Sequence, residues 1–188
     1  LDKTLASIST HTSPGESFSF ASSSSHEASP NAMLERKVGE LRPHEPPLSC
    51  TVGFYQQRLK GEDRHDVRDV QLNGRAYKMV AVFDGHGGAQ AAEHCALHLL
   101  QYVEEAAMKT ADGEATLADM SKACVAAFQR CHEELRASET AGTTASVLVV
   151  DCVRREVLCC NVGDSAVLCV DPVDKRHVGF ASTDHRLH

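Results

Sequence analysis

Residues 77–88 read Tyr-Lys-Met-Val-Ala-Val-Phe-Asp-Gly-His-Gly-Gly, and this stretch decides the fold. Its first part, residues 77–83, is a largely apolar run with β-branched and aromatic side chains, which is typical of a buried strand. Asp84 and His86 follow on a tight glycine-rich turn, where Gly85 leaves its carbonyl oxygen uncovered. A carboxylate and an imidazole two residues apart on a rigid turn are typical parts of a metal-assisted hydrolytic site. Taken alone, these residues fit an Asp-Gly turn with an incidental histidine equally well.

Five further short blocks flank this turn in a fixed order. They are Arg58, Glu62-Asp63, Gly142-Thr143-Thr144-Ala145, Gly163-Asp164-Ser165 and Asp184-His185. The same order of blocks occurs in the type 2C, metal-dependent Ser/Thr protein phosphatases (the PPM family), which the chain resembles over residues 53–185. Six ordered blocks are far more specific than any one of them.

The resemblance implies a metal site built mainly from carboxylates. Asp84 would bridge two divalent cations, Mg²⁺ or Mn²⁺, and Glu62 with the Gly85 carbonyl would complete the binding of one of them. Asp63 would hold a metal-bound water, and Asp164 would bind a weaker third metal that some members of the family contain.

The resemblance also implies the catalytic groups. Two cations would lower the pKa of a shared water from about 15.7 to about 7, which makes hydroxide available to attack phosphorus in line. Arg58 matches the guanidinium that stabilises the charge on the phosphoryl oxygens. His86 matches the proposed general acid for the leaving alkoxide. Thr143 and Thr144 are expected to start a strand and to hydrogen-bond the turn, because no activating base is adjacent in sequence.

The periodicity of apolar residues predicts two helices between groups of strands. Helices are expected over 88–105 and 114–137, and strands over 50–56, 77–83, 144–151, 156–162 and 165–170. The last three strands are expected to form an antiparallel meander, and the first two to be neighbours because only about 20 residues connect them. The fold class is α+β, and the resemblance implies an α-β-β-α sandwich of two antiparallel sheets flanked by helices, with its C-terminal part absent.

Residues 1–48 differ in composition from the rest of the chain. They are rich in Ser and Pro and show no sustained apolar periodicity, so we expect a disordered extension with at most a short helix over 32–41. Residues 49–188 are then the N-terminal portion of a phosphatase domain of the PPM type.

The overall composition excludes several classes of partner. The net charge of −7 disfavours nucleic acid and anionic membranes, because both need a basic surface. No run of 18 apolar residues predicts a membrane span, and a targeting peptide upstream of Leu1 is left open. The eight cysteines form no Cys-x-x-Cys pair, so we expect reduced thiols in a cytoplasmic or nuclear protein. We expect a monomer that acts on phosphorylated proteins.

Two departures from the family pattern matter. The family has an arginine after Gly-Asp-Ser, whereas this chain has Ala166. The family also supplies two more metal-binding aspartates after its Asp-His block, and this sequence ends at His188 without them. We therefore expect the 188 residues alone to be inactive as a phosphatase, because the second cation lacks ligands.

The sequence leaves three functions to compare. We favour metal-dependent hydrolysis of phosphoserine and phosphothreonine in proteins by a metal-bridged hydroxide. A catalytically inactive pseudophosphatase that binds partners is the alternative, and absence of the C-terminal aspartates from the full gene would favour it. A phosphatase of small molecules is the third, and a screen with phosphopeptides would separate it from the first.

Overall fold

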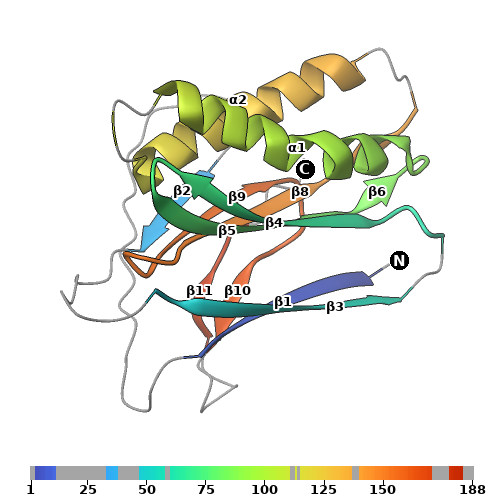
Figure 1. The fold of residues 1–188 in the computed structure, drawn as a ribbon. Coiled ribbons are helices and arrows are strands. Elements are labelled where there is room, and N and C mark those ends of the chain that lie inside the picture. Colours follow the sequence, from blue (N-terminus) through green and yellow to red (C-terminus); the bar gives the residue numbers. More distant parts are fainter. Residues whose placement is uncertain are drawn as a thin grey trace.

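The computed structural model describes residues 3–11, 33–37, 47–57, 60–110, 113, 115–136, 140–170 and 178–183. These residues form layers of sheet and helix (Figure 1). Helices α1 (Gln90–Thr110) and α2 (Leu117–Leu135) cover one face of a five-stranded antiparallel sheet, and two-stranded ribbons lie on its other side. The expected α+β class, with antiparallel sheets flanked by helices, is confirmed.

The main sheet has the strand order β2-β9-β8-β5-β4. Its strands are β2 (Met33–Lys37), β4 (Arg64–Leu72), β5 (Arg75–Phe83), β8 (Ala145–Asp151) and β9 (Glu156–Val162). The second layer contains β1 (Lys3–His11) paired with β3 (Ser49–Gln57), and β10 (Leu168–Val170) paired with β11 (Val178–Ala181). A short pair, β6 (Gly85–His86) with β7 (Gly142–Thr143), lies at the end of β5.

Strands β4 and β5 form a hairpin that the sequence analysis missed. Asn73 and Gly74 both have positive φ, 50° and 82°, which is the conformation of a two-residue type I′ turn. β4 then pairs with β5 along its whole length, and β8 pairs with the other side of β5. The prediction that the strands over 50–56 and 77–83 are neighbours is therefore wrong, because β4 and β8 occupy both sides of β5.

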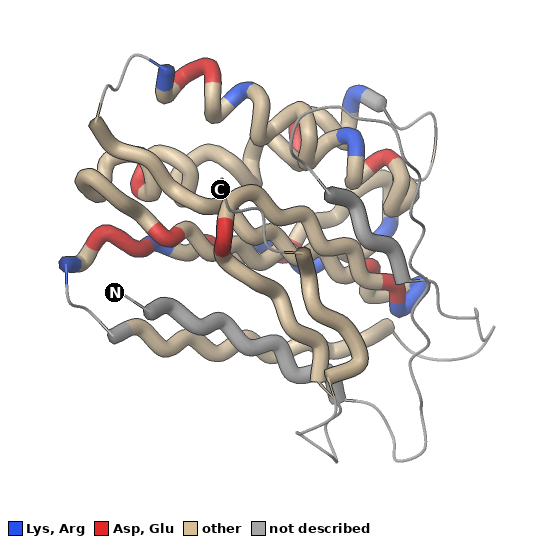
Figure 2. Tube along the Cα trace, turned by 180° about the vertical axis from the view of Figure 1, so that it is seen from behind, with Lys and Arg blue, Asp and Glu red and all other residues tan. Residues whose placement is uncertain are grey.

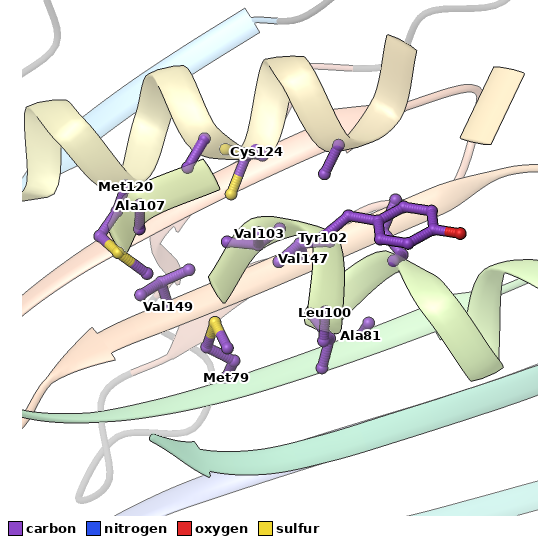
Figure 3. Packing of buried hydrophobic residues seen from close by; sticks show 14 of the residues in the cluster. Met79, Ala81, Leu100, Tyr102, Val103, Ala107, Met120, Cys124, Val147 and Val149 are labelled. Carbon is purple, nitrogen blue, oxygen red and sulfur yellow. The ribbon is translucent and has the colours of Figure 1, made fainter. Parts of the chain in front are cut away.

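The main core lies between the five-stranded sheet and the two helices (Figure 3). Met79 and Ala81 of β5 and Val147 and Val149 of β8 are fully buried on the sheet side. They face a helix surface that is equally closed to solvent. Its side chains include Leu100, Val103, Ala107, Met120 and Cys124. Burial of each larger side chain stabilises the fold by roughly 1.5–3 kcal/mol, so this interface holds the sheet in place.

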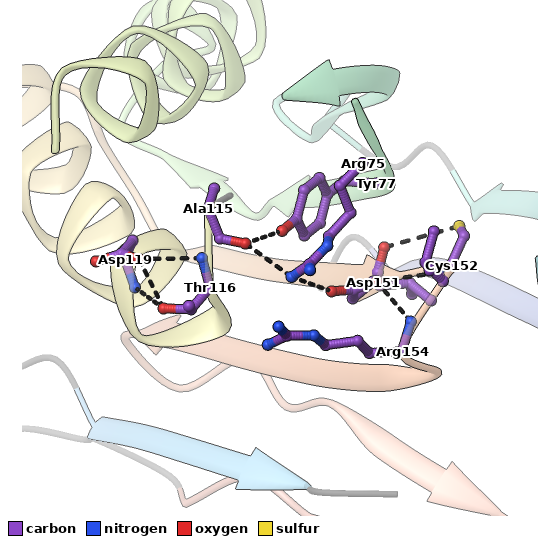
Figure 4. A network of polar contacts seen from close by, with 10 residues as sticks. Arg75, Tyr77, Ala115, Thr116, Asp119, Asp151, Cys152 and Arg154 are labelled. Carbon is purple, nitrogen blue, oxygen red and sulfur yellow. Dashed lines mark hydrogen bonds and ion pairs between the residues drawn. The ribbon is translucent and has the colours of Figure 1, made fainter. Parts of the chain in front are cut away.

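A buried polar network fixes the hairpin against the start of α2 (Figure 4). The Arg75 guanidinium donates to the carbonyl of Ala115 at 3.0 Å and lies 3.5 Å from the Asp151 carboxylate. The Tyr77 hydroxyl donates to the same Ala115 carbonyl at 2.6 Å. Burial of Tyr77 raises the pKa of its phenol, so the hydroxyl stays protonated as a donor.

The N-terminal 48 residues are not irregular throughout. β1 pairs with β3 and β2 pairs with the edge strand β9, so Lys3–His11 and Met33–Lys37 differ from the expected disordered extension. β2 also lies where at most a short helix was expected. Hydrogen bonds to the open edge of β9 hold this segment extended, which overrides its local helix propensity.

The third strand of the expected meander also lies elsewhere. The chain bends at Gly163, which has a φ of 97°, and leaves the main sheet. β10 therefore covers only Leu168–Val170 and pairs with β11 instead of β9. Strands β3, β10 and β11 contain no charged residue, whereas charged residues are spread along both helices (Figure 2).

None of the helices in the described ranges is long and apolar enough to cross a membrane.

A capping box at Thr116 starts α2. The Thr116 hydroxyl accepts from the backbone N–H of Asp119 at 3.2 Å, and the Asp119 carboxylate accepts from the backbone N–H of Thr116 at 3.0 Å. We expect Thr116→Ala to lower the free energy of unfolding by about 1 kcal/mol, because an N–H of the first turn loses its acceptor. Urea denaturation measures this loss. Gln129→Ala, at an exposed position of the same helix, is the matched control and should change stability by less than about 0.5 kcal/mol. Equal losses in the two variants would contradict the role of the cap.

The same cap makes stability depend on pH. Hydrogen bonds from Thr116 hold the pKa of the Asp119 carboxyl below its usual value. Its contribution to stability is therefore complete above the unfolded pKa of about 3.9 and is lost as the pH falls through the lower folded pKa. We expect wild type to exceed Asp119→Asn in unfolding free energy near pH 6 and this gap to narrow towards about pH 2.5. A gap that widens on acidification, measured by urea denaturation across this range, would refute the assignment.

Candidate active site

Thr144 holds the turn that follows β5 through two hydrogen bonds with Asp84, and we call this contact the clasp. The backbone N–H of Asp84 donates to the Thr144 hydroxyl at 3.2 Å, and the backbone N–H of Thr144 donates to the Asp84 carbonyl at 2.9 Å. The Thr144 hydroxyl also lies 2.6 Å from the Ser165 hydroxyl. Three of the sequence blocks thus meet at one buried threonine, and Thr144 hydrogen-bonds the turn as the sequence predicts.

Glu62 reaches the same turn from the segment that precedes β4. One carboxylate oxygen accepts from the backbone N–H of Gly88 at 2.8 Å, and the other lies 3.9 Å from the Lys60 ammonium. A Cβ added at Gly85 would overlap the backbone carbonyl of Glu62, so this approach requires glycine at position 85. The predicted closeness of Glu62 to the turn is present, although β4 and not β3 provides it.

Asp63 is buried beneath this segment, with 2% of its surface exposed. Its backbone carbonyl accepts from the side-chain amide of Gln56 at 3.1 Å and from the Arg64 guanidinium at 2.8 Å. Arg64 also forms an ion pair with Glu93 of α1. A hollow of about 310 Å³ opens here, and its lining includes His65 as well as Gln56, Asp63 and Arg64.

His86 lies exposed at the tip of the turn. In the β6–β7 pair, Gly85 lies opposite Thr143 and His86 opposite Gly142. A Cβ at Gly142 would overlap the imidazole of His86, so the ring rests against that glycine. Solvent access and a fixed ring position are what a proton donor to a bound substrate requires.

The structure brings some of the predicted site residues together and leaves others apart. Glu62, Asp84, Gly85 and His86 belong to one turn and the segment packed on it. Asp164 is exposed in the bend after β9, where its neighbour Ser165 contacts the clasp. Arg58, Asp184 and His185 lie outside the described residues. No group of three or more His, Cys, Asp or Glu side chains in the part that the structure describes is arranged to hold a metal ion.

The donor atoms of the turn suit a hard divalent cation. The carboxylates of Glu62 and Asp84 and the carbonyl of Gly85 offer only oxygen, which Mg²⁺ and Mn²⁺ prefer. The glycine at position 85 lets the backbone of Glu62 approach the turn. Three such groups are fewer than the roughly six oxygens that a cation of this kind takes, so water or further ligands would complete the shell.

Sequence reasoning did not identify the hydrogen-bond roles of Ser165 and Arg64. Ser165 contacts Thr144, and Arg64 holds the backbone of Gly61 and Asp63. Both residues were within recognised blocks or beside them. The partner of Ser165 is 21 positions away, and Arg64 bonds backbone carbonyls one and three residues before it. Spacing alone reveals neither kind of contact.

A family-wide sequence profile described as "Protein phosphatase 2C" (PP2C) matches residues 55–187. The chain belongs to the protein phosphatase 2C family. Curated relatives of this phosphatase family include "Probable protein phosphatase 2C 33" of Oryza sativa subsp. japonica, 32% identical over 85% of this chain and 38% of the relative. "Probable protein phosphatase 2C 15" of Arabidopsis thaliana is 30% identical over 83% of this chain and 36% of the relative. This protein phosphatase 2C chain therefore spans less than two fifths of the length of these relatives.

One solved structure is also similar to this protein phosphatase 2C chain. It is described as the structure of a C. elegans sex-determining protein, has 22% sequence identity and a TM-score of 0.47, and covers 81% of this chain and 38% of its own.

The clasp provides a test with a neighbouring control. Thr144→Val keeps the shape of the side chain but removes the acceptor for the Asp84 N–H and the contact with Ser165. We expect a loss of about 1–3 kcal/mol in the free energy of unfolding, because buried polar groups lose their partners.

Thr143→Val is the matched control. The Thr143 hydroxyl donates only to the carbonyl of its neighbour Thr144, at a half-buried position, and water can replace it. Its loss should stay below about 1 kcal/mol in the same denaturation experiment. A larger loss for Thr143→Val than for Thr144→Val would show that the clasp does not hold the turn.

Proposed function

We propose that the complete protein hydrolyses phosphoserine and phosphothreonine in other proteins with the help of Mg²⁺ or Mn²⁺. The observation that carries this proposal is the clasped turn, where the Asp84 backbone is fixed by Thr144 while Glu62 and His86 are held beside it. Membership of the protein phosphatase 2C family supports the reaction class. Ser/Thr specificity and metal dependence are parts of the proposal.

Glu62, Asp84 and the Gly85 carbonyl are the groups that we propose to hold the cations. Bound divalent cations supply a water of lowered pKa and charge stabilisation at the phosphoryl oxygens. The protein fixes its ligands in advance. The Glu62 carboxylate is oriented by the Gly88 N–H, and the backbone of Asp84 is held on both sides by Thr144. Asp63 is proposed to hold a water of this cation site, and Asp164 is proposed to bind a weaker third cation.

His86 is proposed to donate a proton from its imidazole to the oxygen of the leaving serine or threonine. Its exposed ring rests against Gly142, so a substrate can approach from solvent while the ring position is limited. Arg58 is proposed to bind the phosphoryl oxygens through its guanidinium, as its place among the sequence blocks implies.

We propose that the 188 residues alone are a poor phosphatase. They correspond to 38% and 36% of two family members. The described turn and the segment packed on it offer two carboxylates and one carbonyl, which are fewer oxygens than two tightly held cations need.

The reaction is tested with the full-length gene product, a phosphothreonine peptide and Mn²⁺. Asp84→Asn should lower kcat/KM at least about 100-fold, because a proposed ligand of the cations would lose its charge. Glu133→Gln is the matched control, since it neutralises an exposed carboxylate on α2, and it should keep activity within about twofold. Wild-type turnover in Asp84→Asn would refute the assignment of Asp84.

Metal binding by the 188-residue chain gives a readout that does not depend on turnover. Titration with Mn²⁺ followed by electron paramagnetic resonance should show weak binding that Asp84→Asn and Glu62→Gln each reduce about tenfold or more. Glu133→Gln should bind as wild type. Unchanged Mn²⁺ binding in both site variants would mean that the cations lie elsewhere.

The activity assay also tests the alternative function. A full-length protein that binds the phosphothreonine peptide but does not hydrolyse it would favour the pseudophosphatase.

A further inference from the structure

Two cysteines from different layers meet on the side of the main sheet that faces away from the helices. Cys50 belongs to β3, and Cys152 begins the turn after β8. The backbone of Cys152 accepts from the Leu48 N–H at 2.7 Å and donates to the Ala76 carbonyl at 3.0 Å. Cys152 and Leu48 form a small buried cluster with Val150, and Cys50 packs against it. The Cys152 sulfur also lies 3.8 Å from the Val150 carbonyl.

A hollow opens beside this pair. Its volume is about 350 Å³, and both Cys50 and Cys152 line it together with Asp69 and Lys78. Cys50 is half-buried, so a small polar molecule in the hollow can reach the pair without opening the core. Cys50 and Cys152 therefore differ from the cysteines that are enclosed between helices and sheet.

The two sulfur atoms have unequal affinities for a proton. A hydrogen bond from the Cys50 thiol lowers the pKa of Cys152 to about 7, against the opposing effects of burial and of Asp151. The backbone N–H and the ammonium group of Lys78 add to this lowering, although Asp69 pairs with that ammonium. The same hydrogen bond and burial raise the pKa of Cys50. Cys152 is thus the thiol of the pair that loses its proton more readily, which makes it the better nucleophile, and Cys50 holds its proton more tightly.

Two other pairs of thiols are in contact, but they lie within the core. Cys95 of α1 hydrogen-bonds Cys131 of α2, and Cys124 of α2 hydrogen-bonds Cys160 of β9. These four residues are between 0% and 4% exposed. An oxidant in solvent reaches them only when the core opens, so they serve as internal controls.

We propose that Cys50 and Cys152 form a thiol pair that hydrogen peroxide oxidises to a disulfide between the two layers of the sandwich. The Cys152 thiolate attacks one peroxide oxygen, the O–O bond breaks, and the released hydroxide takes a proton to become water. Cys152 is then a sulfenic acid. The Cys50 sulfur attacks the Cys152 sulfur, its proton goes to the departing hydroxide, and a second water leaves. Overall, two thiols and one peroxide give one disulfide and two waters.

The cross-link would act on the strand that supports the candidate site. The other end of β3 contacts β4 and the residue before it. Phe54 of β3 stacks on His65 of β4, with 3.9 Å between the ring centroids, and the Gln56 side chain donates to the Asp63 carbonyl. Joining Cys50 to Cys152 would fix β3 on the main sheet. This inference stands on the thiol pair alone and does not depend on the proposed phosphatase reaction.

The test oxidises the reduced 188-residue chain with a slight excess of hydrogen peroxide, blocks remaining thiols and maps peptides without reduction. A cross-linked peptide containing Cys50 and Cys152 should form first, with a mass loss of two hydrogens. The oxidised chain should also melt at a temperature higher by about 5 °C or more, because the bond closes a long loop of the unfolded chain. Faster loss of Cys95, Cys131, Cys124 or Cys160 would overturn the proposal.

Serine variants of the two cysteines test which sulfur attacks the peroxide first. In Cys50→Ser, dimedone should trap a sulfenic acid at Cys152, because the thiol that would resolve it is gone. In Cys152→Ser, Cys50 should remain unlabelled at the same peroxide concentration. Cys169→Ser, at an exposed position of β10, is the matched control and should form the Cys50–Cys152 peptide at the wild-type rate. Labelling of Cys50 in Cys152→Ser at the rate seen for Cys152 in Cys50→Ser would reverse the assigned roles and refute the mechanism.

Discussion

The pairing of β5 on both of its sides is the constraint on which the rest of the structure depends. β4 and β8 flank this strand, while helices cover one face of the sheet. A strand held in this way cannot slip by one residue, because a slip would send Met79 and Ala81 to the opposite face. The position of Asp84, directly after the strand, is therefore set by packing across the whole core.

The sequence predicts best those helices and strands whose apolar residues recur in a pattern typical of a buried element. β9 matches the expected range of 156–162, and both helices are found with their ends shifted by a few residues. β4 was missed because it is an edge strand with several charged side chains, and such strands lack a long apolar run. The Asn73-Gly74 pair was the available signal, since it favours a tight hairpin.

The candidate site was predictable to the extent that its residues are adjacent in sequence. Asp84, Gly85 and His86 share one turn, so their closeness required no long-range inference. Glu62 was expected near them through the wrong strand pairing, and the hairpin of β4 with β5 brings it there instead. The hydrogen bond of Thr144 with the turn was expected. Its contact with Ser165 was not, because that contact depends on side-chain direction at the ends of distant strands, which a single sequence does not encode in any local pattern.

The long connection between β5 and β8 also has a consequence for the order of assembly. The hairpins β4–β5 and β8–β9 close over short turns, and such units form in about 1–10 μs. Joining them brings together residues as distant as Arg75 and Asp151, 76 positions apart, with α1 and α2 in between. We expect this step to be the slow one, because its loop entropy is lost before the distant contacts form. The turn that carries Asp84 would then be complete only after both helices have docked on the sheet.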